Sequence, residues 1–189
     1  TSSTAKWFNG FKTILDADAA GTNELQKVLI STAMGNLVES TEAISKENAE
    51  DVINDFYWSE AGDAAAGAKL RSQQLKLFMS DQTYHYYTEA YRTNHGSLPY
   101  NQAYDKTSLD GASNVELVHL PCVPKDFLLL TPKNNIFLLF NQKTDDETFL
   151  VEKSLNNHYD VDFIMNYFFG TQFESVSPEV LRYWRKKAE

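Results

Sequence analysis

The sequence has one cysteine, few basic residues and no long apolar run, and each shortage excludes a class of protein. The single cysteine, Cys122, cannot form an intrachain disulfide. No segment approaches the roughly 18 consecutive apolar residues that a membrane-spanning helix needs. Seventeen Lys and Arg stand against twenty-six Asp and Glu, for a formal net charge of −9. This balance argues against nucleic acid as the main partner, because binding a phosphate backbone needs clustered cations.

The chain also lacks the motifs that identify common enzyme classes. It contains no P-loop, no Gly-x-Ser-x-Gly elbow, no His-Glu-x-x-His and no dinucleotide-binding fingerprint. Missing motifs do not exclude an enzyme, but they favour a non-enzymatic protein, and we expect no cofactor. A single cysteine favours an intracellular or organellar location, and a start at Thr1 without Met is compatible with a processed N-terminus.

What is present is a sequence able to fold around a core. Its 189 residues suit one large domain or two small ones, and 42% of them are hydrophobic. Residues 1–96 have the 3.6-residue periodicity of helices. Their apolar stripes predict helices near 7–15, 25–33 and 49–57, the last with Ser45 as its N-cap, and a long helix from Lys69 to the stop at Asn94-His95-Gly96.

The pattern changes after a predicted loop at 97–114. In the region 115–189, four segments read as strands in a meander joined by hairpins: 115–120, 127–131, 136–141 and 148–153. A short helix over 161–169 and a last helix from Ser177 are expected to follow, with Arg182, Arg185, Lys186 and Lys187 at the final helix end. The predicted fold class is therefore α+β, with a helical N-terminal half, a four-stranded antiparallel meander and C-terminal helices.

Two of these strands are apolar without alternation. Phe127-Leu128-Leu129-Leu130 and Ile136-Phe137-Leu138-Leu139-Phe140 carry no polar residue. Strands that are buried on both faces have this composition. We expect the centre of the sheet to be covered on both sides, by helices or by a partner.

The stretch Asp16-Ala17-Asp18-Ala19-Ala20-Gly21 lies between two of the predicted helices. Together with 11–15 and 22–29, it resembles the first helix-loop-helix of the EF-hand family, and the resemblance extends over residues 5–80 to a second pair of predicted helices. It implies a rigid helix pair available for packing. The fifth loop position is Ala20 and the twelfth is Lys27, so two of the ligand positions offer no carboxylate. We expect no calcium binding at physiological levels and no metal site.

Aromatic residues are concentrated at the end of the long predicted helix and in the loop after it. Consecutive aromatics occupy every face of a helix, and exposed tyrosine is favoured at protein interfaces. The alternative is that loop 97–114 folds back over them. The predicted partner-binding residues are Tyr84, Tyr86, Tyr87, Tyr91, Tyr100 and Tyr104. The resulting hypothesis is a structural or adaptor subunit that binds other protein subunits.

Two alternatives remain open. One is an enzyme or small-ligand-binding domain whose pocket contains His119 and Cys122, three residues apart, although a lone cysteine is more often a small core residue. The other is a secreted filament protein, because the helix-to-loop junction at 89–99 is similar to that of type IV pilin-like proteins. A Gly-Pro helix stop explains the same residues.

Overall fold

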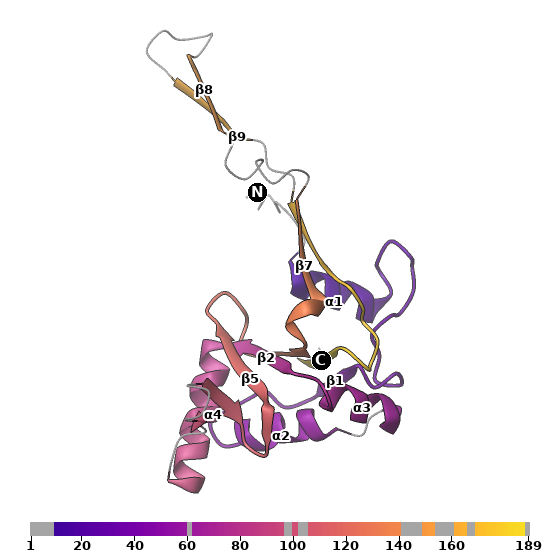
Figure 1. Ribbon diagram of the computed structural model, residues 1–189, viewed down its shortest axis with the longest axis vertical. Helices are drawn as coiled ribbons and strands as arrows, with labels where there is room; N and C mark the ends of the chain where they lie inside the picture. The colour runs from indigo at the N-terminus through magenta and orange to yellow at the C-terminus, as the bar shows by residue number, and fades with distance from the viewer. Residues whose placement is uncertain are drawn as a thin grey trace.

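The computed structural model of the chain describes residues 10–59, 62–96, 100–101, 106–140, 149–153, 161–165 and 169–187 (Figure 1). The helices are α1 (Phe11–Ala20), α2 (Ala49–Trp58), α3 (Ala64–Arg71) and α4 (Asp81–His95), with a 3₁₀ turn η1 (Lys133–Asn135). The strands are β1 (Leu37–Ser40), β2 (Leu75–Ser80), β3 (Tyr100–Asn101), β4 (Lys106–Leu109), β5 (Ala112–Leu120), β6 (Phe127–Thr131), β7 (Ile136–Phe140), β8 (Phe149–Lys153), β9 (Val161–Met165), β10 (Phe169–Phe173) and β11 (Arg182–Lys186). No helix within these ranges is long and apolar enough to cross a membrane.

A seven-stranded mixed sheet has the strand order β1-β11-β6-β2-β5-β4-β3. β1 runs parallel to β11 and β2 parallel to β5, whereas the other neighbours are antiparallel. At the centre, Leu77 lies opposite Leu117 on β5 and opposite Leu130 on β6. A parallel pair needs a crossover connection, and the segment that contains α4 provides it between β2 and β5.

Alternate residues of β6 enter two hydrophobic clusters, one on each face of the sheet. Leu128 and Leu130 join the cluster that includes residues of α2, α3 and α4, while Phe127 and Leu129 join the cluster that includes α1. All five residues of β6 are buried. Successive side chains point to opposite faces, so a continuously apolar strand is one with both faces covered. For this strand the expectation from the sequence is confirmed.

The predicted fold class is wrong. The strands form a mixed sheet and two separate two-stranded sheets, β10-β7 and β8-β9, in place of one four-stranded antiparallel meander. The meander fails because the four predicted strands, which correspond to β5, β6, β7 and β8, do not pair with one another. β5 pairs with β2 and β4, β6 with β2 and β11, β7 with β10, and β8 with β9. Strands from both halves of the sequence contribute to the mixed sheet.

The long helix expected from Lys69 is divided by a strand. Residues up to Arg71 form α3, Leu75–Ser80 form β2, and α4 begins only at Asp81. Leu75, Leu77 and Met79 are buried at every second position, which is the period of a strand. Ser80 caps α4 by accepting a hydrogen bond from the Thr83 N–H. The predicted end of this helix is confirmed, since Gly96 is the left-handed C-cap with φ 69°.

The second helix expected near 25–33 does not form. Turns and irregular backbone fill this range, and β1 begins at Leu37. The buried Asn36 holds the segment: its Oδ1 accepts from the Ser31 N–H, and its Nδ2 donates to the Leu29 and Val176 carbonyls. The helix-loop-helix shape that the EF-hand resemblance implies is therefore incomplete. The helix near 49–57 is confirmed as α2, although Asn48, and not Ser45, precedes it.

Three other expectations are corrected. The range 97–114 contains β3, β4 and the start of β5, with a tight turn at Asp110-Gly111 where Gly111 has φ 71°. Residues 161–165 form β9 and Phe169 begins β10, where a helix was expected. The last helix is replaced by a turn at 178–180 followed by β11, so the basic residues Arg182, Arg185 and Lys186 lie on a strand.

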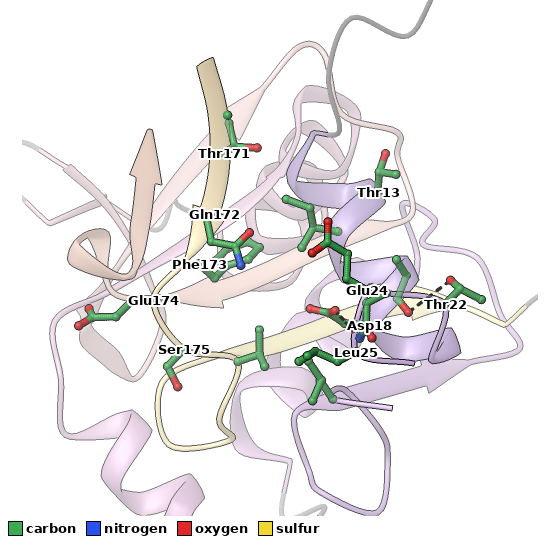
Figure 2. Close-up of a pocket in the computed structure, with 16 residues that line it drawn as sticks. Thr13, Asp18, Thr22, Glu24, Leu25, Thr171, Gln172, Phe173, Glu174 and Ser175 are labelled. Carbon is green, nitrogen blue, oxygen red and sulfur yellow. Dashed lines mark hydrogen bonds between the residues drawn. The ribbon is translucent and has the colours of Figure 1, made fainter. Parts of the chain in front are cut away.

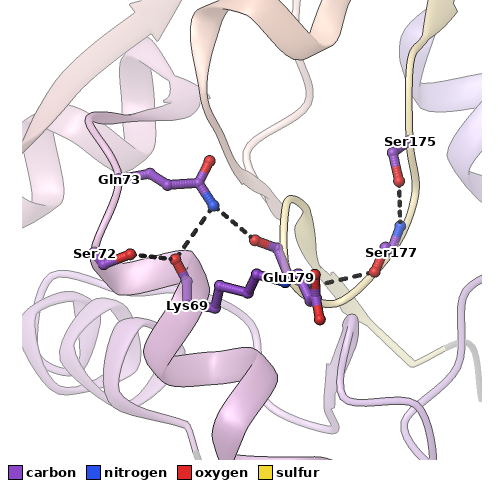
Figure 3. Close-up of polar contacts among 6 residues, drawn as sticks. All are labelled: Lys69, Ser72, Gln73, Ser175, Ser177 and Glu179. Carbon is purple, nitrogen blue, oxygen red and sulfur yellow. Dashed lines mark hydrogen bonds and ion pairs between the residues drawn. The ribbon is translucent and has the colours of Figure 1, made fainter.

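Hydrogen bonds and an ion pair join the turn at 178–180 to the end of α3 (Figure 3). Gln73 Nε2 donates to the Glu179 carbonyl at 2.9 Å and to the Lys69 carbonyl at 3.2 Å. Lys69 Nζ lies 2.6 Å from Glu179 Oε2. These contacts place the start of β11 against α3.

Candidate functional site

Two strands leave the mixed sheet as a ribbon, defined here as β7 and β10 (Figure 1). They pair antiparallel from Ile136 opposite Phe173 to Phe140 opposite Phe169, and neither pairs with another strand in the described part of the chain. Phe137, Leu138 and Leu139 are 43%, 55% and 55% exposed. Because consecutive strand residues point to opposite faces, both faces of the ribbon carry exposed apolar side chains.

The base of the ribbon is packed into the protein. Phe173 is buried, and its ring centroid lies 5.1 Å from that of Phe11 on α1. Ile136 packs against the same cluster, and the buried Asn135 donates to Thr131 Oγ1 at 2.9 Å. The exposed residues of β7 thus begin directly beyond a fixed base.

Covering the exposed side chains of the ribbon with a partner would contribute favourable free energy. Fully burying a Leu or Phe side chain contributes about 1.5–3 kcal/mol, so covering the exposed half of three such side chains would contribute about 2–4 kcal/mol. A two-stranded sheet is marginally stable alone and gains from a third strand or from packing. The ribbon is therefore an exposed apolar two-stranded sheet that a further strand or a packed partner would stabilise.

A cleft of about 810 Å³ lies beside the ribbon, between α1, the turn at 22–25 and β10 (Figure 2). Apolar residues such as Ile14, Leu29 and Phe173 line it together with the acidic residues Asp18 and Glu24. The cleft and the ribbon share the residues of β10 from 170 to 173, so they form one continuous surface.

The two aspartates of the calcium-loop-like stretch make contacts within the protein. Asp16 accepts a hydrogen bond from the Tyr183 hydroxyl at 3.0 Å and pairs with Lys12, one turn earlier on α1. Asp18 is buried, and its Oδ1 accepts from Asn23 Nδ2 at 2.9 Å. Among the described residues, no group of three or more His, Cys, Asp or Glu could hold a metal ion. The family relationship itself stays a prediction.

The four tyrosines of α4 lie on or near the core. Tyr87 is fully buried; burial is the main cause that raises the pKa of its hydroxyl, which accepts a hydrogen bond from the Asp110 N–H at 3.5 Å. Tyr84, Tyr86 and Tyr91 are partly buried and pack against the same cluster. Tyr87 therefore contributes to the core, and the other three present only part of their surface.

The side chains of the remaining two tyrosines fall outside what the structure describes. Tyr100 belongs to β3, where only the backbone is described, and Tyr104 lies outside the described residues. Partner binding by the tyrosine set stays a prediction.

His119 and Cys122 lie at the end of β5 and in the turn after it. His119 Nδ1 lies 2.6 Å from Asp81 Oδ1, and its ring stacks on Tyr84 with centroids 4.7 Å apart. Cys122 is an exposed free thiol, so it is not the small core residue that a lone cysteine often is. Neither His119 nor Cys122 lines the cleft beside β10.

Comparisons with known proteins give a weak likeness. No protein-family model and no curated protein matches the sequence. The fold is similar to a chain of the satellite phage P4 procapsid, which includes the size determination (Sid) protein, with a TM-score of 0.45 and 10% identity over 74% of this chain and 38% of that one. It is also similar to a chain of a virus-like particle from Pyrococcus furiosus, with a TM-score of 0.45 and 10% identity over 92% of this chain and 64% of that one.

In both cases the chain spans less than two thirds of the structure that it resembles. Likeness at this level does not bear on function. The functional argument therefore depends on the ribbon itself, whose exposed residues were visible in the sequence as the apolar run Phe137-Leu138-Leu139. The cleft could not be predicted from the sequence, because its walls come from residues near 20 and near 170.

Proposed function

We propose that this chain is a non-enzymatic structural subunit that assembles with further copies of itself through the ribbon. The observation that supports this most directly is the run of exposed residues Phe137, Leu138 and Leu139 beyond a buried base. A contiguous exposed apolar surface is typical of a protein-protein contact.

A second copy fits the ribbon for two reasons. Within the described part of the chain, each strand of the ribbon has one neighbouring strand, so an outer edge is open to a further strand by β-augmentation. Net charges of −9 on each copy repel one another, and β7 and β10 contain no Asp, Glu, Lys or Arg, so a contact between copies at the ribbon adds no further repulsion.

The test is the mass of the protein in solution. Size-exclusion chromatography with light scattering should give a mass above that of one chain for the wild type, and a monomer for the double variant Leu138→Lys, Leu139→Lys. Met34→Lys is the matched control, because Met34 is an exposed apolar residue outside the ribbon. A wild type that stays monomeric at millimolar concentration, or a ribbon variant that keeps the wild-type mass, would contradict the proposal.

Electron microscopy of the assembled wild type then distinguishes the forms of assembly. An isologous contact closes into a dimer, whereas a head-to-tail contact gives a ring or a filament. The filament is the form that the pilin-like alternative requires.

A further inference from the structure

Two arginine side chains meet beside α3. Arg182 on β11 is 2% exposed, and Arg71 at the end of α3 is partly buried. A Cβ atom on Gly67 would lie 3.4 Å from Arg182 Nη2 and 3.4 Å from Arg71 Nη1. The two guanidinium groups thus flank the same position on the helix, where the residue has no side chain.

Carbonyl groups at the end of α2 offset part of the positive charge of the two guanidinium groups. Arg182 Nη1 donates to the carbonyl groups of Phe56 and Tyr57, at 3.1 Å each. These carbonyls belong to the last turn of α2, where backbone acceptors have no intrahelical partner and the helix dipole is negative. Burial, and to a lesser degree the charge of Arg71, lower the pKa of the Arg182 guanidinium.

The remaining donors are not satisfied. Arg182 Nε and Arg71 Nη1 are buried and have no hydrogen-bond partner in the described part of the chain. Buried charged groups in proteins are normally paired or hydrogen-bonded, so two adjacent guanidinium groups with unpaired donors are an unfavourable arrangement.

The site is next to the surface. The guanidinium carbon of Arg71 lies 5.6 Å from the centre of the Trp58 ring, and Trp58 is 53% exposed. One of the two guanidinium groups therefore lies close to an exposed side chain.

We propose that Arg71 and Arg182 bind an oxyanion, a carboxylate or phosphate group whose oxygen atoms accept hydrogen bonds from both guanidinium groups beside Gly67. The planar guanidinium fork matches the oxygen atoms of these groups, and a negative charge there relieves the repulsion between the two arginines. This site is separate from the ribbon and does not depend on self-assembly.

The first test measures the melting temperature of the full chain in inorganic phosphate or acetate, against chloride at equal ionic strength. At least one oxyanion should raise the wild-type melting temperature saturably. The rise should be lost in Arg71→Gln and kept in Arg92→Gln, the matched loss of an exposed arginine on α4. A response to phosphate identifies a phosphate group as the ligand chemistry, and a response to acetate alone identifies a carboxylate. No rise with either anion, or an equal rise in Arg71→Gln, would overturn the proposal.

The second test places a carboxylate at the site within the chain. Gly67→Asp and Gly67→Asn have nearly the same shape and differ in charge, and the neighbouring atoms are the ends of flexible side chains. Gly67→Asp should melt at a higher temperature than Gly67→Asn and should no longer respond to the oxyanion. An Asp variant that melts at or below the temperature of the Asn variant would overturn the proposal even if the ligand were never identified. Circular dichroism confirms that each variant is folded.

Discussion

Asn135 and Ser175 bond to each other in both directions, and this pair fixes the base of the ribbon. Asn135 Nδ2 donates to the Ser175 carbonyl at 2.9 Å, and the Ser175 N–H donates to Asn135 Oδ1 at 2.8 Å. The Glu174 N–H also donates to the Asn135 carbonyl at 3.0 Å. One asparagine therefore joins the start of β7 to the end of β10.

Replacing this asparagine should cost far more than replacing its neighbour. We predict that Asn135→Ala lowers the free energy of unfolding by about 2–4 kcal/mol, because it removes hydrogen bonds to the buried Thr131 hydroxyl and to the partly buried N–H and carbonyl of Ser175. Asn134→Ala, one residue earlier and exposed, should change it by less than about 0.5 kcal/mol. Urea denaturation measures both. Equal effects would show that the side chain of Asn135 does not hold the ribbon.

The sequence predicted the strands whose composition fits a strand better than a helix. β6 is buried on both faces, as its continuous apolar run indicates, and the strand at Ile136 was also expected. For β7 the same expectation is wrong in the single chain, since Leu138 and Leu139 are each 55% exposed. A continuous run of apolar residues therefore does not by itself show that both faces of a strand are covered within its own chain.

The errors arose where two periods fit the same residues. Leu75, Phe78 and Met79 have helical spacing, while Leu75, Leu77 and Met79 have strand spacing. The choice is made by tertiary contacts, because β2 lies between β5 and β6 at the centre of the sheet. No local pattern contains that information.

The pairing of Arg71 with Arg182 could not be predicted from the sequence either. Arg182 belongs to a basic cluster that indicates a solvated helix end, yet it is buried on a strand. Its neighbours at Gly67 and Arg71 are more than a hundred positions away in the sequence. Only the fold brings them together.

Gly62 should be the least replaceable of three glycines that differ in backbone angle and surroundings. It has φ 78°, and a Cβ there would lie 2.6 Å from both Met34 O and Gly35 Cα. Gly62→Ala should therefore destabilise the protein by more than about 2 kcal/mol, because strain and a backbone clash add.

Two other alanine variants separate these causes. Gly111→Ala has φ 71° but open space, so it should cost about 1 kcal/mol. Gly10→Ala has neither feature and should cost about 0.5 kcal/mol, because Gly10 is the N-cap of α1 and Ala is a poorer N-cap than Gly. Thermal unfolding of the three variants should give the order Gly62, Gly111, Gly10. Equal losses for Gly62→Ala and Gly111→Ala would show that the contact with residues 34 and 35 does not constrain position 62.

Where the turn at 178–180 contacts α3, the hydrogen bonds of Gln73 should contribute more to stability than the ion pair between Lys69 and Glu179 (Figure 3). The Lys69 and Glu179 side chains are 64% and 42% exposed, so water screens their attraction. Glu179→Gln should cost less than about 1 kcal/mol, and less still in 0.5 M salt, about five times an ordinary buffer. Gln73→Ala removes two bonds to backbone carbonyls from a partly buried site and should cost about 1–2 kcal/mol at any salt concentration. The reverse order in chemical denaturation would contradict this account.

The buried Tyr183 should make the protein sensitive to alkaline pH. Its hydroxyl donates to Asp16 Oδ1 at 3.0 Å, and burial, followed by the charge of Asp16, raises its pKa above the ordinary value of 10.0. A group whose folded-state pKa is raised contributes its full stability below the pKa of the unfolded state and loses it as the pH rises further. The free energy of unfolding should therefore fall above about pH 10, by up to about 1.4 kcal/mol per pH unit for this residue.

Two variants test this contribution. Tyr183→Phe removes the hydrogen bond, so its free energy of unfolding should be about 1 kcal/mol lower than that of the wild type at pH 7, yet it should fall less steeply between pH 10 and 11. Asp16→Asn removes one cause of the raised pKa but keeps burial, which is the largest cause, so its slope should stay close to that of the wild type. Urea denaturation at each pH measures all three, and a Tyr183→Phe slope equal to that of the wild type would show that this hydroxyl does not govern alkaline stability.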